Sequence, residues 1–149
     1  MYNILILHGP NLNLLGEREP QIYGHTTLDQ LNDLLRSYAH ERCATLTIRQ
    51  SNSEGILIDL LHDSRMWAHG VIINPGALTH YSYSIRDAIA SIGIPTVEVH
   101  LSDIESREPF RRISVMKDVC IAQVAGFGIQ SYYKALDLLI TYLEGTESK

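Results

Sequence analysis

The stretch YNILILHGPNLN, residues 2–13, sets the fold of this chain. Its first part contains the uninterrupted apolar run Ile4–Leu7, so both faces of this segment must be buried. A short apolar run that ends at a Gly-Pro turn predicts an inner strand of a parallel sheet. The polar residue Asn11 follows directly, so hydrogen-bonding groups are expected at the carboxyl end of this first strand.

Beyond this strand, short apolar segments alternate with segments of helical period. The strands are predicted over residues 2–8, 45–50, 70–74, 96–100 and 119–124. The helices are predicted over residues 27–41, 53–64, 81–92 and 131–143, with Leu34 and Ile56 among the inward side chains. The alternation favours right-handed crossovers and an α/β fold, a three-layer sandwich around a five-stranded parallel sheet.

Length and composition predict one domain that spans residues 1–149. Hydrophobic residues make up 45% and charged residues 19% of the chain, which is enough for a sizeable core and excludes wholesale disorder. The formal net charge of −5 argues against a nucleic-acid partner, because such a protein needs a basic face.

Membrane and metal sites are not expected either. The apolar run near the start is too short for a membrane span or a signal-peptide core. Cys43 and Cys120 lie far apart without a CxxC pattern, and no histidines pair at zinc spacing, so we expect no metal site. Reduced cysteines favour a cytoplasmic location.

Three predicted strands end in polar groups. The first ends at His8, the third at Asn74 and the fourth at His100. In an open parallel sheet, ligands bind beyond the carboxyl ends of the strands, so these ends are candidate binding positions. The competing interpretation is that they are ordinary turn residues, since asparagine, proline and glycine are common in turns.

Two long loops follow these strand ends. The loop over residues 9–26 is longer than most connections, as lids and binding loops often are. It contains Arg18, and the loop over residues 101–112 contains Arg107 and Arg111. Arginines in two loops of an acidic chain indicate an anionic small ligand such as a carboxylate. The alternative is that these arginines are solvated surface residues.

Three blocks of the sequence resemble one known family, type II 3-dehydroquinate dehydratase. They are GPNLNLLGEREPQIYG at 9–24, NPGALTHYSYSIRDA at 74–88 and EVHLSDIESREPFRR at 98–112. The resemblance extends over nearly the whole chain and implies a flavodoxin-like fold. It also implies conversion of 3-dehydroquinate to 3-dehydroshikimate and water without a cofactor or metal, in the shikimate pathway or in quinate breakdown.

The resemblance implies a role for each matching residue. Tyr23 matches the general base, Arg18 the residue that activates it, Asn11 the residue that holds a water at the enolate oxygen, and His100 the general acid. The substrate-binding positions are Asn74 with the backbone amides of Leu101 and Ser102 for the carboxylate, and His80, Asp87 and Arg111 for the ring hydroxyls. The family assembles as a dodecamer of four trimers, in which the residue matching Asp87 reaches in from a neighbouring subunit.

The chemistry of these residue types agrees with those roles. A free phenol titrates near pH ~10, so a tyrosine base needs cations beside it, and Arg18 and Arg107 are the candidates. Glu98 lies two positions before His100 on the same side of a strand, where it can orient the imidazole and keep it protonated. Glu19 is expected to anchor Arg18 or the loop.

At one position the chain departs from the family pattern. Asp103 stands where the family usually has asparagine, and an inward-facing carboxylate there would weaken the binding of an anion.

Two other functions are known on this kind of fold. A flavodoxin-type electron carrier needs a glycine- and hydroxyl-rich phosphate loop after the first strand, where this chain has residues 10–13, Pro-Asn-Leu-Asn. A phosphorelay receiver needs acidic residues at that strand end, where this chain has His8.

Overall fold

The computed structural model describes residues 1–147 of the chain, and of Ile22 and Tyr23 it describes the backbone alone. Its strands form one five-stranded sheet in the order β2-β1-β3-β4-β5, and every pairing is parallel. The strand bounds are β1 Tyr2–His8, β2 Ala44–Gln50, β3 Gly70–Asn74, β4 Thr96–His100 and β5 Ala122–Ala125. This order is the flavodoxin-like one, so the predicted fold class is confirmed.

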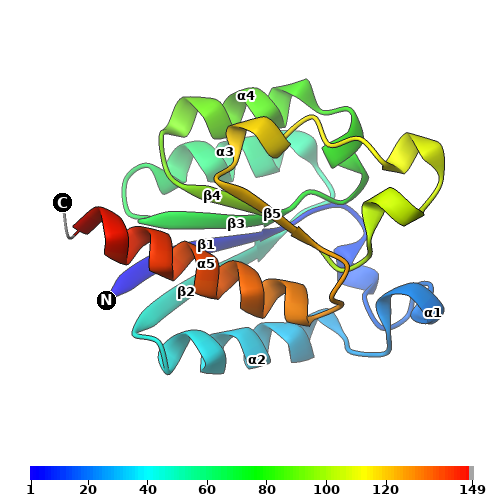
Figure 1. Cartoon of the computed structure of the whole chain (residues 1–149), viewed down its shortest axis with the longest axis horizontal. Coiled ribbons are helices and arrows are strands. Elements are labelled where there is room, and N and C mark those ends of the chain that lie inside the picture. Colours follow the sequence, from blue (N-terminus) through cyan, green and yellow to red (C-terminus); the bar gives the residue numbers. More distant parts are fainter. Residues whose placement is uncertain (148–149) are drawn as a thin grey trace.

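Helices cover both faces of the sheet (Figure 1). Their bounds are α1 Pro20–Tyr23, α2 Leu28–His40, α3 Glu54–Ser64, α4 Tyr83–Ile92 and α5 Gln130–Glu147. The helices α2 and α5 pack on one face and α3 and α4 on the other, while α1 lies in the first long loop, beyond the end of the sheet. Short 3-10 turns fill the connections at η1 Leu12–Leu14, η2 Gly76–His80, η3 Ile104–Ser106, η4 Pro109–Arg111 and η5 Lys117–Val119.

The alternation of side chains along β1 divides the core in two. Ile4 and Ile6 pack with the residues of α2 and α5, and Leu5 and Leu7 pack with those of α3 and α4. The run Ile4–Leu7 is almost fully inaccessible to solvent, as the opening stretch of the sequence predicts. Burial of both faces therefore fixes β1 in the interior of the sheet.

Local capping explains where the helices begin and end. Thr27 accepts from the backbone N–H of Gln30, and the Gln30 side chain accepts from the N–H of Thr27, which makes a capping box at the start of α2. Ser82 caps α4, and Gly93 ends it in the left-handed conformation at φ 69°.

Several predicted details are wrong. Strand β5 starts at Ala122, because the residues before it close the 3-10 turn η5. Helix α5 spans Gln130–Glu147 and so continues past residue 143, where the predicted helix ends. Leu34 is 44% exposed and Ile56 is 51% exposed, because the buried stripes of their helices run through neighbouring positions instead.

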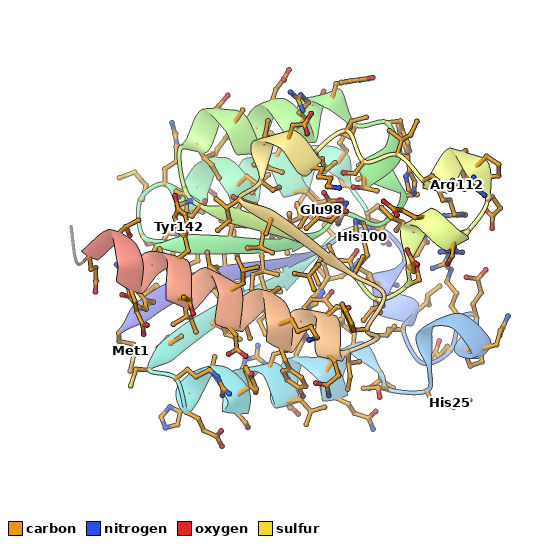
Figure 2. The ribbon with its side chains drawn as sticks, in the orientation of Figure 1. Met1, His25, Glu98, His100, Arg112 and Tyr142 are labelled. Atoms are coloured by element: carbon orange, nitrogen blue, oxygen red, sulfur yellow. The ribbon has the colours of Figure 1, made fainter. Side chains whose placement is uncertain are left out.

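The two long loops meet at the carboxyl end of the sheet. Figure 2 shows Glu98 and His100 near this end, towards the loop residues His25 and Arg112 and away from Met1 and Tyr142. Within residues 1–147, no helix is long and apolar enough to cross a membrane.

Candidate active site

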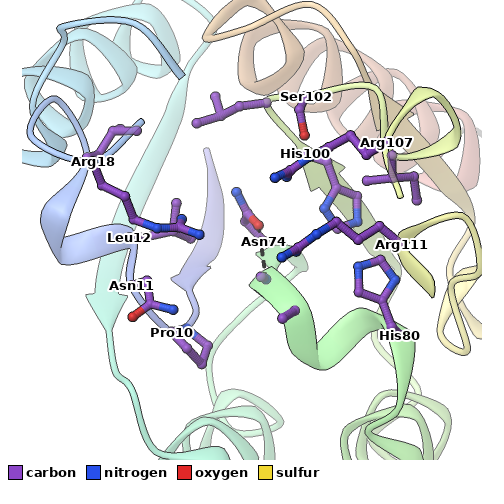
Figure 3. Close-up of a pocket in the computed structure, with 15 residues that line it drawn as sticks. Pro10, Asn11, Leu12, Arg18, Asn74, His80, His100, Ser102, Arg107 and Arg111 are labelled. Atoms are coloured by element: carbon purple, nitrogen blue, oxygen red, sulfur yellow. Dashed lines mark hydrogen bonds between the residues drawn. The ribbon is translucent and has the colours of Figure 1, made fainter. Parts of the chain in front are cut away.

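A cavity opens where the carboxyl ends of the strands meet the two long loops (Figure 3). It holds about 780 Å³ of empty space, part of it open to solvent. Its lining comes from the loop after β1, the turn after β3 and the loop after β4. The residues are Pro10, Asn11, Leu12, Leu15, Arg18, Asn74, Gly76, Ala77, His80, His100, Leu101, Ser102, Ile104, Arg107 and Arg111.

His100 is held against a buried carboxylate. Its Nε2 lies 2.5 Å from Oε2 of Glu98, a residue with no solvent exposure. A carboxylate only accepts hydrogen bonds, so Nε2 carries a proton and Nδ1 is the ring nitrogen left to serve a ligand. His100 can therefore give a proton from Nδ1 only as the imidazolium.

Two hydroxyl groups complete the shell of Glu98. Ser114 Oγ lies 2.8 Å and 2.9 Å from the two carboxylate oxygens, and Thr79 Oγ1 donates to Oε2. Burial alone would raise the pKa of Glu98, but the hydrogen bond and charge of His100 and the bonds from Thr79 and Ser114 outweigh it and lower the pKa. Glu98 is therefore ionised at neutral pH.

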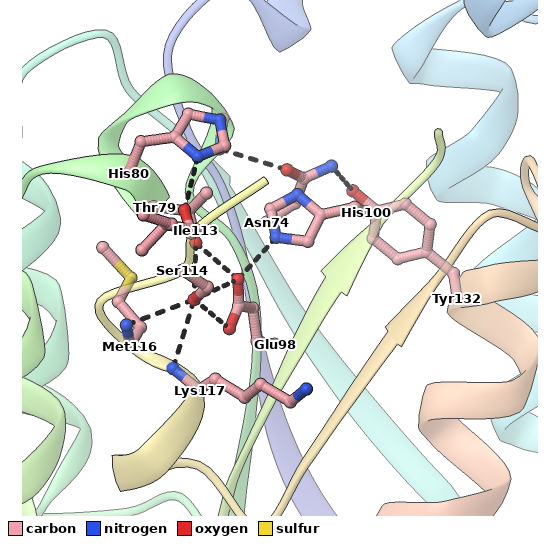
Figure 4. Close-up of polar contacts among 11 residues, drawn as sticks. Asn74, Thr79, His80, Glu98, His100, Ile113, Ser114, Met116, Lys117 and Tyr132 are labelled. Atoms are coloured by element: carbon pink, nitrogen blue, oxygen red, sulfur yellow. Dashed lines mark hydrogen bonds and ion pairs between the residues drawn. The ribbon is translucent and has the colours of Figure 1, made fainter. Parts of the chain in front are cut away.

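A second polar cluster lies on the other face of the sheet, and Figure 4 shows two of its residues, Asn74 and Tyr132. Nδ2 of Asn74 donates to the hydroxyl of Tyr132 at 3.1 Å, and Oδ1 of Asn74 accepts from the N–H of Gly76 at 3.1 Å. The Tyr132 hydroxyl also lies 2.9 Å from Nδ1 of His8, whose Nε2 lies 2.9 Å from Oδ1 of Asn32. Asn74 thus enters the cavity from a rigid, buried support.

The arginines of the two loops converge on one acid. Oε2 of Glu19 lies 3.7 Å from the Arg18 guanidinium and 3.8 Å from that of Arg107. Arg111 donates to Glu108 at 2.6 Å. In Figure 3, Arg18 and Asn11 lie across the cavity from His100, Arg107 and Arg111. The cavity therefore carries three guanidinium groups on its walls, a setting that favours an anion.

The turns at the strand ends are tightly packed. The N–H of Gly9 donates to the carbonyl of Asn74 at 2.7 Å. A Cβ on Gly9 would lie 2.8 Å from that same carbonyl oxygen and from backbone atoms of Pro75. Asn11 has a left-handed backbone at φ 71°, and its N–H donates to the Asn52 side chain at 3.0 Å. Glycine at position 9 is thus needed for the close approach of the first and third strand ends.

Most residues implicated by the sequence lie around this one cavity. The side chains or backbone of these residues line it: Asn11, Arg18, Asn74, His80, His100, Leu101, Ser102, Arg107 and Arg111. Glu98 and Glu19 hold lining residues from behind. Nδ1 of His80 donates to the carbonyl of Ile113 at 2.7 Å, which leaves Nε2 to a ligand.

Three implicated residues have a different place. The side chain of Tyr23 lies outside the described residues, and its backbone ends α1. Asp87 is exposed on α4 and does not line the cavity of its own chain. Asp103 caps η3 by accepting from the N–H of Glu105 and also does not line the cavity, so the inward-facing carboxylate considered above is not found.

Sequence reasoning missed part of the supporting shell. Tyr132 and Thr79 are fully buried, and each bonds a candidate site residue. Tyr132 lies four residues before Leu136 on the buried face of α5, so nothing local distinguishes it from a packing tyrosine. Thr79 lies within the matching block 74–88, and Ser114 lies just past the block 98–112. This proximity is the signal in the sequence that could have identified them.

The arrangement can bind an anion and transfer protons. Among the residues that the structure describes, no three His, Cys, Asp or Glu side chains lie close enough together to hold a metal ion. The polar groups at hand are guanidinium groups, backbone amides, an asparagine amide and a carboxylate-bound imidazole. These groups suit proton transfer to and from a small acid.

Comparisons with known proteins agree on one family. The chain matches the family Dehydroquinase class II over residues 2–140. It is 55% identical over 144 residues to the 3-dehydroquinate dehydratase of Trichodesmium erythraeum, covering 97% of this chain and 96% of the relative. It is 53% identical over 142 residues to that of Dictyoglomus turgidum, covering 95% and 98%. The crystal structure of type II dehydroquinase from Butyrivibrio crossotus matches with a TM-score of 0.91 and 44% identity, covering 93% of this chain and 97% of that one.

Proposed function

The chain belongs to the class II dehydroquinase family, and from this premise we propose that it removes water from 3-dehydroquinate to give 3-dehydroshikimate, in the shikimate pathway or in quinate breakdown. One observation carries the proposal: a single cavity joins three arginines to a histidine that is bonded to a buried, ionised glutamate. A ring acid that must lose a proton and a hydroxyl group needs both features. The proposed catalytic domain comprises residues 1–149.

Substrate binding is assigned to the strand ends. Nδ2 of Asn74 keeps one N–H for a ligand after bonding Tyr132, and with the backbone amides of Leu101 and Ser102 it binds the carboxylate. Nε2 of His80 and the Arg111 guanidinium bind the ring hydroxyls. Fixed N–H donors and a guanidinium together favour a small anion over a neutral ring.

Tyr23 is assigned as the base that takes the proton next to the ketone. Forming a phenolate at neutral pH from an ordinary tyrosine costs about 4 kcal/mol, at about 1.36 kcal/mol per pK unit. Arg18 and Arg107 supply positive charge to offset this cost, and Glu19 holds both guanidinium groups at the cavity wall. Arg18 and Glu19 directly precede α1, the short helix that ends at Tyr23.

The elimination then proceeds in two steps. The C–H proton moves to the Tyr23 oxygen, and the electron pair forms an enolate that Asn11 stabilises through a bound water. The enolate collapses, the C–O bond breaks, and His100 gives its Nδ1 proton to the departing hydroxyl, which leaves as water. Base and acid act from opposite faces of the ring, which is an anti elimination. A proton released from Tyr23 and one taken up by His100 restore the enzyme. No step requires a cofactor or metal.

We further propose a homododecamer of four trimers in which Asp87 completes a neighbouring subunit's site. The exposure of Asp87 on α4 supports this, as do the nearby Tyr81 and Tyr83, which are 62% and 66% exposed. Tyrosine is enriched at interfaces between protein subunits. Fully active monomers in dilute solution would contradict the proposal that Asp87 completes a neighbouring subunit's site.

The free thiols of Cys43 and Cys120 support a cytoplasmic location.

The proposed reaction is tested by turnover of purified protein. The protein is mixed with 3-dehydroquinate in the presence of a metal chelator, and formation of the conjugated enone is followed by ultraviolet absorbance. We expect turnover that also survives borohydride, because no lysine Schiff base takes part. Absence of turnover in folded, assembled protein would refute the proposed reaction, and loss of turnover with borohydride would refute the proposed mechanism.

A further inference from the structure

We propose that Tyr132, His8 and Asn32 form a positioning relay that fixes the amide of Asn74 for the substrate's carboxylate. The inference rests on the proposed function, because it concerns how that site holds its ligand. None of these three residues lines the cavity. They come from α5, the end of β1 and α2, so the relay ties two helices and the central strand to one side chain.

The direction of the relay begins at Asn74. Its Oδ1 accepts from the N–H of Gly76, a group that can only donate, so this contact identifies which amide atom is the oxygen. The nitrogen Nδ2 therefore faces Tyr132 and donates one of its two hydrogens to the hydroxyl oxygen. The second hydrogen is the one that remains for a ligand in the cavity.

The direction of the remaining hydrogen bonds follows because each buried donor needs an acceptor. The Tyr132 oxygen accepts from Asn74, and its own proton finds an acceptor in Nδ1 of His8 at 2.9 Å. His8 then carries its proton on Nε2 and donates to Oδ1 of Asn32 at 2.9 Å. The opposite tautomer of His8 would donate to Tyr132 and leave the hydroxyl proton without an acceptor inside the protein, which is costly for a buried group.

Burial keeps the relay neutral. His8 and Tyr132 are both 0% exposed. Burial lowers the pKa of His8 to about 4 and raises the pKa of Tyr132, so neither is charged near neutral pH. The relay therefore acts on the ligand through the orientation of Asn74 and not through charge of its own.

This orientation matters for an anion in particular. An Asn74 amide turned by half a rotation would present its oxygen to the substrate's carboxylate and repel it. The carboxylate is bound alike in substrate and transition state, since it takes no part in the elimination. Loss of the relay should therefore raise KM and leave kcat nearly unchanged.

The test compares two tyrosine variants of the assembled enzyme. Tyr132→Phe removes the acceptor of Asn74, and Tyr38→Phe is its control, because the Tyr38 hydroxyl also tethers α5, through Asp137 at 2.6 Å, but has no path to the cavity. We expect KM to rise about 10-fold in Tyr132→Phe, equivalent to about 1.4 kcal/mol. We expect kcat to stay within about 2-fold, and KM to be unchanged in Tyr38→Phe.

A second pair of variants tests the relay one step further away. Asparagine at position 8 can place Oδ1 near the position of the His8 Nδ1 atom and keep an acceptor for Tyr132, whereas leucine cannot. His8→Asn should therefore retain a near-normal KM and His8→Leu should not. This pair keeps the inference testable if Tyr132→Phe does not fold. Nitrogen NMR of histidine-labelled wild type should show His8 neutral with its proton on Nε2.

The outcomes separate the relay from the reaction. A wild-type enzyme without turnover refutes the proposed function itself. Normal wild-type turnover with an unchanged KM in Tyr132→Phe or in His8→Leu would overturn the relay, even if the melting temperature fell. A proton on Nδ1 of His8 would overturn the assigned direction. A higher KM in Tyr132→Phe and His8→Leu, with both control variants near normal, supports the relay.

Discussion

Replacing Glu98 by glutamine removes one negative charge from behind His100 and keeps the volume of the side chain. The carboxylate is fully buried and accepts from His100, Ser114 and Thr79. A hydrogen bond to a charged group contributes about 1.5–3 kcal/mol. At about 1.36 kcal/mol per tenfold change in rate, kcat should fall roughly 10- to 150-fold. KM should change little, because Glu98 does not line the cavity.

The assay is steady-state turnover of 3-dehydroquinate at neutral pH. Glu105→Gln is the matched control, since it removes an exposed carboxylate from the loop after β4. Ser114→Ala should have a smaller effect, because the carboxylate keeps its charge. A Glu98→Gln enzyme with wild-type kcat would refute the reasoning.

Three further predictions follow from the site and its support. Tyr23→Phe should lower kcat by about 10²- to 10⁴-fold with little change in KM, because a general base is lost; a variant that keeps most of its turnover would show that another group is the base. Gly9→Ala should cost about 1–3 kcal/mol of unfolding free energy and raise KM, because its Cβ would meet the Asn74 carbonyl oxygen at 2.8 Å. Denaturant unfolding tests this against Gly55→Ala in α3, where a Cβ has ordinary room, and equal stabilities of the two variants would contradict it. Burial lowers the pKa of His8 from 6.5 to about 4, so the folded protein favours the neutral imidazole. The stability that His8 contributes is therefore complete above pH 6.5 and is lost as the pH falls towards about 4. The free energy of unfolding should drop by about 3 kcal/mol over this pH range, and by less in His8→Asn. If unfolding free energy fell equally steeply with pH in both proteins, His8 would not be a buried neutral histidine.

The sequence predicts the sheet and most of the site because both depend on local patterns. A short apolar run such as Ile4–Leu7, followed by a Gly-Pro turn, favours an inner strand. The polar residues His8, Asn74 and His100 then mark three strand ends. In a parallel sheet these ends share one edge, so residues far apart in the chain come together. The pairing of Glu98 with His100 follows from the period of two in a strand, and the contact is present.

The remaining features depend on contacts between distant elements, which no local pattern encodes. Tyr132 looks like any aromatic residue of an amphipathic helix until α5 packs beside Asn74. The inward face of α3 is also ambiguous, because Ile56 and Leu57 are both apolar and only packing against the sheet selects Leu57. The roles of the candidate site residues, Tyr23 and Asp87 among them, were assigned by resemblance and remain predictions.

The central claim is that 3-dehydroquinate loses water by anti elimination in this cavity. The most direct measurement uses substrate with deuterium at the carbon next to the ketone, on the face opposite the departing hydroxyl, and follows the label by NMR during turnover with a metal chelator present. The account predicts 3-dehydroshikimate without the label, because Tyr23 removes the hydrogen from that face. Product that retains the deuterium, or no product from folded and assembled protein, would contradict it.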